Sequence, residues 1–219
     1  EHALISGGED ALHAHLLPWI DRATTVDLAV SFLMASGVRL VIPHLRDLLE
    51  RGGRLRLLTG DYMDVTEPTA LRLVAALQGD RHLCVFRAAQ IPFHPKAWIF
   101  GFEAGTGAMI VGSSNLSRSA LTTGVEWNMR HFDRVDAAPL HAARQAFDSL
   151  LQRPETTNMT DTWIDDYEAR RPESLPRVSG IAPEPTPDLP RPHEVQAEAL
   201  RALELTRAKG YGAGLVVLA

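Results

Sequence analysis

The chain has 219 residues, which is the length of about one and a half average domains. Its hydrophobic fraction of 45% and its charged fraction of 22% exclude a wholly disordered protein. No apolar run approaches the ~18 residues of a membrane-spanning helix. The formal net charge is −5. Proteins that bind nucleic acid through their overall charge are usually basic, so any such contact must be made here by a local patch.

The number of cysteines and the N-terminal residues indicate the cellular compartment in which the protein is expected. Cys84 is the only cysteine, which excludes an intrachain disulfide and a thiolate metal cluster. The chain opens on Glu1-His2-Ala3, without the basic head and apolar stretch of a secretory signal. We therefore expect a protein of the reducing cytoplasm that makes no membrane contact.

The first 150 or so residues alternate between short apolar runs and helical spacing. Strands are predicted at residues 26–32, 54–59, 82–86, 93–102, 108–111 and 125–132, and helices at residues 38–50, from 66 onward, 138–151 and 162–171. The small-residue loop at residues 104–107 indicates that the two strands beside it form a hairpin or lie next to each other. This order predicts an α/β sandwich with a mixed sheet flanked by helices.

A change of composition follows these elements. Residues 172–192 contain seven prolines together with Ser, Gly and Glu, which predicts an extended linker. Residues 194–209 then have helical spacing, and residues 213–219 form an apolar run typical of a strand. A strand without a partner is not a domain, so this tail is predicted to be the opening of a further domain.

Lysine is rare in this chain. Of the 22 basic residues only Lys96 and Lys209 are lysines. Because Arg replaces Lys nearly everywhere else, Lys96 is expected to stand where a compact ammonium does what a planar guanidinium cannot.

Lys96 belongs to a group of polar residues in otherwise apolar surroundings. His94 lies two residues before it, so the two side chains share one face of a predicted strand. The turn Gly112-Ser113-Ser114-Asn115 follows the next predicted strand, and Glu126 lies on the one after. An unpaired Lys is almost never buried, so a simple core is not expected here.

These side chains match the chemistry of a phosphate diester. Lys96, Ser113 and Asn115 can neutralise the non-bridging oxygens. A neutral His94 can attack phosphorus, and Glu126 can hold the imidazole in the required tautomer. No metal is required by this scheme.

Structural interpretations of the same residues stay open. Ser113 and Asn115 are common turn residues, and Glu126 also fits an exposed strand position. Trp98 and Trp127 are predicted to be core side chains and not base-stacking platforms.

The pattern resembles the phospholipase D superfamily, whose motif is His-x-Lys followed by Gly-Ser-x-Asn. Within it, residues 1–155 are similar to the nuclease-like branch that is joined to superfamily 2 helicases. The resemblance implies a phospholipase D-like sandwich and a DNA phosphodiesterase of a helicase-coupled restriction, defence or repair protein. Gly101 stands where the motif often has Asp. Nuclease members commonly lack that Asp, but its loss also fits a decayed site that only binds DNA. A lipid phosphodiesterase is a further alternative.

The tail resembles the start of a helicase core. Residues 191–200 are similar to the adenine-contacting Gln motif, with Gln196 as its glutamine, and residues 215–219 to the strand that feeds a phosphate-binding loop. That loop is missing from the sequence. The resemblance implies that ATP and Mg bind only a full-length protein and that the nuclease domain needs no cofactor. The expected domains are residues 1–155, a short helix and linker at 156–190, and a truncated helicase start at 191–219.

The family site is built from two His-x-Lys motifs. None of the other eight histidines has a Lys two residues later. The resemblance therefore implies a homodimer whose two motifs face each other across a two-fold axis. One His94 would attack the phosphate, and the partner's His94 would protonate the leaving oxygen.

Overall fold

The computed structural model describes residues 3–88, 91–171, 198–199, 201–203 and 205–206. The chain divides into two compact units, Glu1–Ile181 and Ala182–Ala219. The described residues of the second unit are helical, in agreement with the helix predicted over 194–209. The predicted linker, the terminal strand and Gln196 lie outside the described residues.

The first unit is built on one mixed sheet of eight strands, in the order β1-β7-β6-β5-β2-β3-β4-β8. Strands β2, β3 and β4 are parallel neighbours, and the other neighbouring pairs are antiparallel. The strands are β1 (Leu4–Ile5), β2 (Thr25–Val30), β3 (Arg54–Gly60), β4 (Asp80–Phe86), β5 (Lys96–Gly101), β6 (Gly107–Gly112), β7 (Asn128–Phe132) and β8 (Thr156–Asn158). The predicted mixed α/β sheet is thereby confirmed, including the β5–β6 hairpin.

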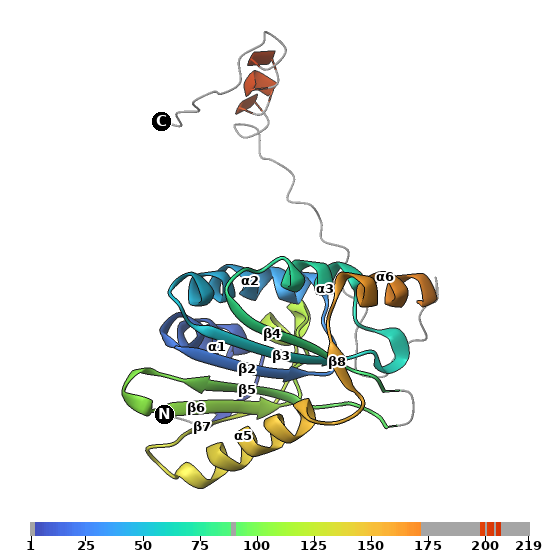
Figure 1. Ribbon diagram of the computed structural model, residues 1–219. Coiled ribbons are helices and arrows are strands. Elements are labelled where there is room, and N and C mark those ends of the chain that lie inside the picture. Colours follow the sequence, from blue (N-terminus) through green and yellow to red (C-terminus); the bar gives the residue numbers. More distant parts are fainter. Residues whose placement is uncertain (1–2, 89–90, 172–197, 200, 204, 207–219) are drawn as a thin grey trace. The chain divides into compact units, whose positions relative to one another are not determined.

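Helices cover both faces of this sheet. They are α1 (Leu12–Arg22), α2 (Ala35–Glu50), α3 (Pro68–Ala75), α4 (Arg118–Thr122), α5 (Ala137–Leu151) and α6 (Asp161–Arg170). Helices α1, α2, α3 and α6 lie on one face, and α5 lies on the other (Figure 1). None of the helices in the described residues has the length and hydropathy needed to cross a membrane.

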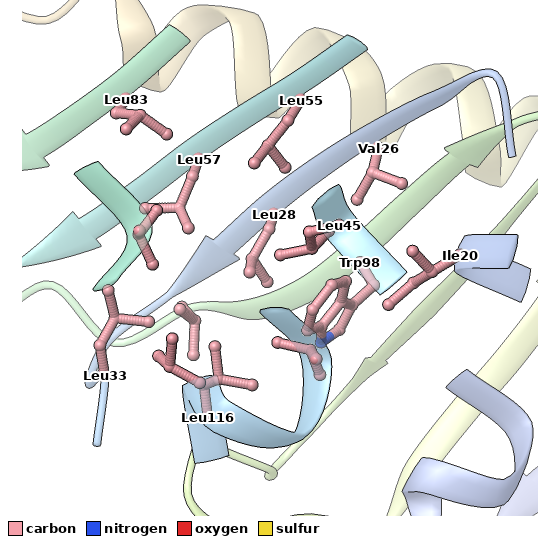
Figure 2. Close-up of a cluster of buried hydrophobic side chains, with 14 of the residues drawn as sticks. Ile20, Val26, Leu28, Leu33, Leu45, Leu55, Leu57, Leu83, Trp98 and Leu116 are labelled. Carbon is pink, nitrogen blue, oxygen red and sulfur yellow. The ribbon is translucent and has the colours of Figure 1, made fainter. Parts of the chain in front are cut away.

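The alternation of side chains along each strand produces two cores. On β5, Trp98 and Phe100 face the larger core under α1, α2, α3 and α6, whereas Ile99 faces the smaller core under α5. Figure 2 shows Trp98 in the larger core beside Leu28 of β2. Trp98 is buried, as predicted.

Two strands begin later than the sequence predicts. β5 begins at Lys96, because Pro95 has no N–H to donate to a sheet ladder. β7 begins at Asn128, and in the segment ahead of it Gly124 O accepts from Gly8 N at 3.1 Å. His94 and Glu126 therefore lie in the segments that lead into strands and not on the strands themselves.

The folded unit continues beyond residue 155, the predicted end of the first domain. β8 pairs with β4 at the sheet edge, and α6 packs against α3. The Tyr167 side chain of α6 is fully buried, and its hydroxyl donates to Thr66 O at 2.8 Å. Arg170 pairs with Asp61 at 2.5 Å. These contacts make α6 a structural part of the unit that carries the sheet.

Replacing Tyr167 should therefore destabilise the sheet domain. We expect Tyr167→Ala to lower the free energy of unfolding by about 3 kcal/mol, because it leaves a cavity and an unpaired carbonyl at Thr66. Urea denaturation followed by circular dichroism measures this. Asp166→Ala, an exposed change on the same helix, is the control and should have little effect. Equal stability of the two variants would show that α6 is not part of the cooperative unit.

Candidate active site

The predicted site residues come together where β5 begins and its neighbours β2 and β6 end. We call these strand ends the site edge of the sheet. β5 runs antiparallel to both β2 and β6, so its first residue, Lys96, lies beside the last residues of those strands. Ser31 follows β2, and Ser113 follows β6. Glu126 lies just ahead of β7, which pairs with β6. Residues distant in sequence thus share one edge.

Lys96 is the centre of this arrangement. Its Nζ lies 2.9 Å from His94 Nδ1 and donates to Ser31 Oγ at 3.3 Å and to His94 O at 3.2 Å. The residue is only 8% exposed. Burial lowers the pKa of Lys96 from 10.5 to about 8, opposed by the charge of Glu126. Lys96 is therefore cationic at neutral pH but close to losing its proton.

His94 is exposed at the same edge. Partial desolvation and, to a smaller extent, the Lys96 ammonium lower the pKa of His94 below its ordinary value of 6.5. The imidazole ring stands edge-on to Phe32, with 5.7 Å between the ring centroids. A neutral, accessible imidazole beside a cation is the state that nucleophilic attack on a phosphate requires.

Glu126 is bonded to Ser113 and not to His94. The Ser113 hydroxyl donates to Glu126 Oε2 and accepts from Trp127 N at 3.0 Å. The described residues show no hydrogen bond between Glu126 and His94, and the Glu126 charge acts on Lys96 instead. The role of Glu126 in orienting the imidazole stays a prediction.

Asn115 belongs to the same turn as Ser113. The turn is held by backbone bonds: Leu116 N donates to Phe32 O at 3.2 Å, and Met34 N donates to Leu116 O at 3.0 Å. Asn115 Oδ1 is buried and has no hydrogen-bond partner within the described part of the chain. Buried polar atoms are normally paired, so this open acceptor next to Ser113 fits a position that a donor such as water completes, whereas a phosphate oxygen would have to meet Asn115 at its Nδ2.

Ser31 was not among the residues predicted for the site. Its side chain is fully buried, and its hydroxyl accepts from Lys96 while it donates to Pro95 O at 3.1 Å. The sequence carried a signal for it, because Ser31 is a polar residue directly after an apolar strand, at the strand end where α/β sites gather.

Gly101 lies at the opposite end of β5 from Lys96. It is paired with Thr25 of β2 and Gly107 of β6. Because β5 places about 3.3 Å between successive residues, an acid at position 101 would be remote from His94. The glycine therefore removes no group from the site edge, and the interpretation of Gly101 as a mark of decay loses its basis.

The prediction that Trp127 is a core residue is wrong. Trp127 is 66% exposed, whereas the next residue, Asn128, is buried with its amide donating to Ser114 Oγ at 2.9 Å. Successive residues of an extended chain point to opposite sides, so burying Asn128 turns Trp127 outward.

The fold of the first unit is similar to that of two solved structures. NucT from Helicobacter pylori superposes with a TM-score of 0.52 at 14% identity, over 66% of this chain and 89% of that chain. A phospholipase D family member, Nuc from Salmonella typhimurium, superposes with a TM-score of 0.54 at 14% identity, over 71% of this chain and 95% of that chain. No family model and no curated protein matches the sequence. At this identity the likeness establishes the fold, and the expected phospholipase D-like sandwich is confirmed.

The buried ammonium should reduce the stability of the fold at neutral pH. An unfolded lysine keeps its proton up to about pH 10.5, whereas Lys96 in the folded chain loses it above about pH 8. The unfolded state therefore binds more protons between these values, so stability should rise with pH in this window. We expect Lys96→Met to raise the free energy of unfolding at pH 7 by roughly 2 kcal/mol, with the gain fading toward pH 10.5.

Urea unfolding of wild type and Lys96→Met at pH 7, 8.5 and 10 measures this difference. Subtracting the wild-type free energy of unfolding from that of the variant at each pH cancels the contribution of the other titrating groups. A constant difference across the series would contradict the lowered pKa of Lys96.

Proposed function

We propose that this chain is a metal-independent phosphodiesterase that cuts DNA through a phosphohistidine on His94, within a homodimeric site. The observation that carries the proposal is the His94–Lys96 pair. A mostly buried ammonium lies 2.9 Å from an exposed imidazole at an open sheet edge, with a serine hydroxyl as its other side-chain hydrogen-bond partner. A structural lysine would be expected to pair with a carboxylate or to reach water.

In the first step the Ser113 hydroxyl turns from Glu126 to the substrate. Lys96 Nζ, the Ser113 hydroxyl and Asn115 Nδ2 then donate to the non-bridging phosphate oxygens and offset their charge. The imidazole of His94 attacks phosphorus, so an N–P bond forms as the P–O bond to the leaving strand breaks. The partner's His94 enters this step as an imidazolium, because the bound phosphate anion favours its charged form. The leaving oxygen takes its proton, and the partner's imidazole becomes neutral.

The second step restores the site. The neutral imidazole of the partner's His94 accepts a proton from water as that water attacks phosphorus. The N–P bond breaks, and the pair of electrons returns to the nitrogen of His94. Each histidine ends in the state in which it began, so no metal or cofactor enters this scheme.

The C-terminal residues support a second part of the proposal, that this domain belongs to a helicase. From the resemblance of residues 191–200 to the Gln motif, we place this domain at the start of a cytoplasmic helicase for restriction, defence or repair. In the full-length protein Gln196 would contact the adenine of ATP, and Mg would accompany the nucleotide. DNA is then the shared substrate of both parts.

Removing the nucleophile should abolish cleavage without unfolding the chain. We expect His94→Ala to reduce plasmid cleavage in EDTA by at least about 10³-fold, because the covalent route is lost. Gel electrophoresis of supercoiled plasmid measures this. His141→Ala is the control, since His141 is exposed on α5. Equal cleavage by wild type and His94→Ala would refute catalysis, and salt-dependent DNA binding without cleavage would identify a binding module.

The pH dependence of cleavage should follow Lys96. Above about pH 8 the ammonium of the free protein loses its proton and no longer attracts the phosphate, so kcat/KM, which reports the free protein, should fall with an apparent pKa near 8. Lys96→Arg should cleave more slowly, because the larger guanidinium does not fit the position of the ammonium, but its remaining activity should show no fall near pH 8, because guanidinium stays charged. A wild-type rate that is flat from pH 7 to 10 would exclude Lys96 as the phosphate cation.

A further inference from the structure

Arginine side chains gather at the end of the sheet that lies away from the site edge. Here β2, β3 and β6 begin and β5 ends, and the β5–β6 hairpin turns (Figure 1). At about 3.3 Å per residue, Lys96 and Gly101 at the two ends of β5 lie about 17 Å apart. This far edge is therefore a separate surface and not part of the candidate active site.

Three hollows adjoin one another along the far edge. Their volumes are about 520, 340 and 270 Å³. Phe102 and Thr106 line all three hollows, which therefore form one continuous depression that we call the far-edge groove. The groove passes the ends of five neighbouring strands, from Phe132 of β7 to Arg54 of β3. With about 4.8 Å between neighbouring strands it is about 19 Å long, which accommodates several phosphates of a nucleic-acid strand.

The far-edge groove has an excess of positive charge. Seven arginines and four acidic residues line it, in a chain whose formal net charge is −5. One of the acidic residues, Asp27, is paired with Arg56 at 2.6 Å, so these two charges offset each other. The remaining arginines form the kind of local basic patch through which an acidic chain can bind a polyanion.

Two of these arginines are held by neutral acceptors. Arg51 Nη2 donates to Ile20 O at 3.1 Å and to Ala23 O at 3.0 Å. Arg144 Nη2 donates to Phe100 O at 3.2 Å. A carbonyl oxygen orients a guanidinium without cancelling its charge, whereas a carboxylate would do both. The two cations are thus positioned at the groove with their charge still available to an anion.

Glycines make room for the guanidinium of Arg144. A Cβ atom at Gly107 would lie 3.0 Å from Arg144 Nη2, which is a tight contact, and a Cβ atom at Gly101 would lie 3.6 Å from the same nitrogen. Position 101 is the one at which the sequence motif often has Asp. A carboxylate there would stand beside this guanidinium, so Gly101 leaves the positive charge of Arg144 uncompensated.

Arg22 is central to the groove. It is the last residue of α1 and lines two of the three hollows. Its side chain is exposed and makes no hydrogen bond or ion pair with other residues in the part of the chain that the structure describes. A single solvated arginine is ordinary on a protein surface, but this one lies between two hollows that Arg51 and Arg134 also line.

Aromatic side chains line the same groove. Trp19, Phe102 and Phe132 are half-buried and line the hollow of about 270 Å³. The ring centroids of Trp19 and Phe132 are 4.9 Å apart, and the Arg134 guanidinium lies 4.8 Å from the Phe132 centroid. Surfaces that bind single-stranded nucleic acid combine cations along the backbone with aromatic rings on which bases stack. Because a duplex hides its base faces, this combination favours a single strand.

We propose that the far-edge groove binds a strand of single-stranded nucleic acid, with its arginines on the phosphates and its aromatic rings against the bases. This contact is separate from the candidate active site. It goes beyond the proposed function and needs neither the chemistry of His94 nor a second copy of the chain.

Reversing one charge in the groove tests this. Lys96→Met removes the cation of the candidate active site, and fluorescence anisotropy with a labelled oligothymidylate of about 12 nucleotides then measures binding elsewhere. Adding Arg22→Glu should weaken this binding about 10-fold at low salt and reduce the salt dependence by about one counterion. Circular dichroism confirms that the variants are folded.

The matched control is Arg46→Glu, added to the same Lys96→Met background. Arg46 is exposed on α2 outside the groove, so the same change of charge should alter the affinity less than about 2-fold. Equal affinities of the Arg22→Glu and Arg46→Glu variants would overturn the proposal.

A cross-link locates the bound strand. Cys84 is the only cysteine and is buried, so an introduced cysteine is the one exposed thiol. Thr106→Cys, at the junction of the three hollows, should react with a maleimide-bearing oligothymidylate at least about 10-fold faster than Ser149→Cys. Ser149 is exposed on α5 outside the groove, and equal reaction rates would contradict the proposed position.

A competitor without bases tests the nature of the ligand. Inorganic polyphosphate of the same charge should displace the oligothymidylate poorly, because it cannot stack on the aromatic rings. If it competes as well as an unlabelled oligothymidylate, the groove binds phosphate alone and the proposal is wrong.

Cleavage of a small diester, bis(4-nitrophenyl) phosphate, separates this proposal from the proposed function. The diester is too small to reach from the site edge to the far edge, so Arg22→Glu should cleave it at the wild-type rate. A chain that binds the strand in the groove but cleaves no diester refutes the proposed function alone. A chain that cleaves the diester but binds the strand equally well with and without Arg22→Glu refutes the groove alone.

Discussion

The arrangement of the site depends on the ammonium of Lys96, which is almost completely buried where β5 begins. Lys96 is the first residue of β5. This strand lies between β2 and β6 in the interior of the sheet, so the Lys96 side chain extends from a central strand. Its pKa falls because burial penalises the charged form, and the negative charge of Glu126 only partly compensates. A phosphate would supply the missing counter-charge. The same burial that destabilises the free protein therefore favours binding of a dianionic or monoanionic ligand.

The position of Lys96 follows from the sheet topology. Because β5 runs against β2, the start of one strand meets the end of the other, and Ser31 comes within hydrogen-bond distance of the ammonium. The turn after β6 is fixed on Phe32 and Met34 by backbone bonds, so Ser113 is held at the same edge. The backbone thus sets the position of the turn, and the Ser113 hydroxyl is held further by Glu126 and by Trp127 N.

Much of the fold could be predicted from the sequence, because the buried strands and amphipathic helices have strong periodic patterns. α1 was missed although Leu12, Leu16 and Ile20 are buried at helical spacing, and β1 and β8 were missed because strands of two and three residues carry no pattern. The sequence predicted which residues would form the site, but it did not predict which of these side chains would be hydrogen-bonded to each other. The bonds from Ser113 to Glu126 and from Lys96 to Ser31 depend on which strands are neighbours. The local periodicity of the sequence does not predict the order of the strands in the sheet.

The need for a lysine here is also explained by what the neighbouring helix cannot offer. α2 begins at Ala35, shortly after β2 ends, so its N-terminus lies toward the edge where phosphate would bind. Helix N-termini commonly bind phosphate through free N–H groups. In this chain Ala35 N already donates to Glu67 Oε2 at 2.6 Å, so a carboxylate occupies that end of the helix. Its negative charge would oppose a phosphate there. The anion is then left to side chains from β5 and from the turn after β6, and among these Lys96 is the cation. A compact ammonium fits between His94 and Ser31, where a planar guanidinium would need more room, and this accounts for a lysine in a chain that otherwise uses arginine.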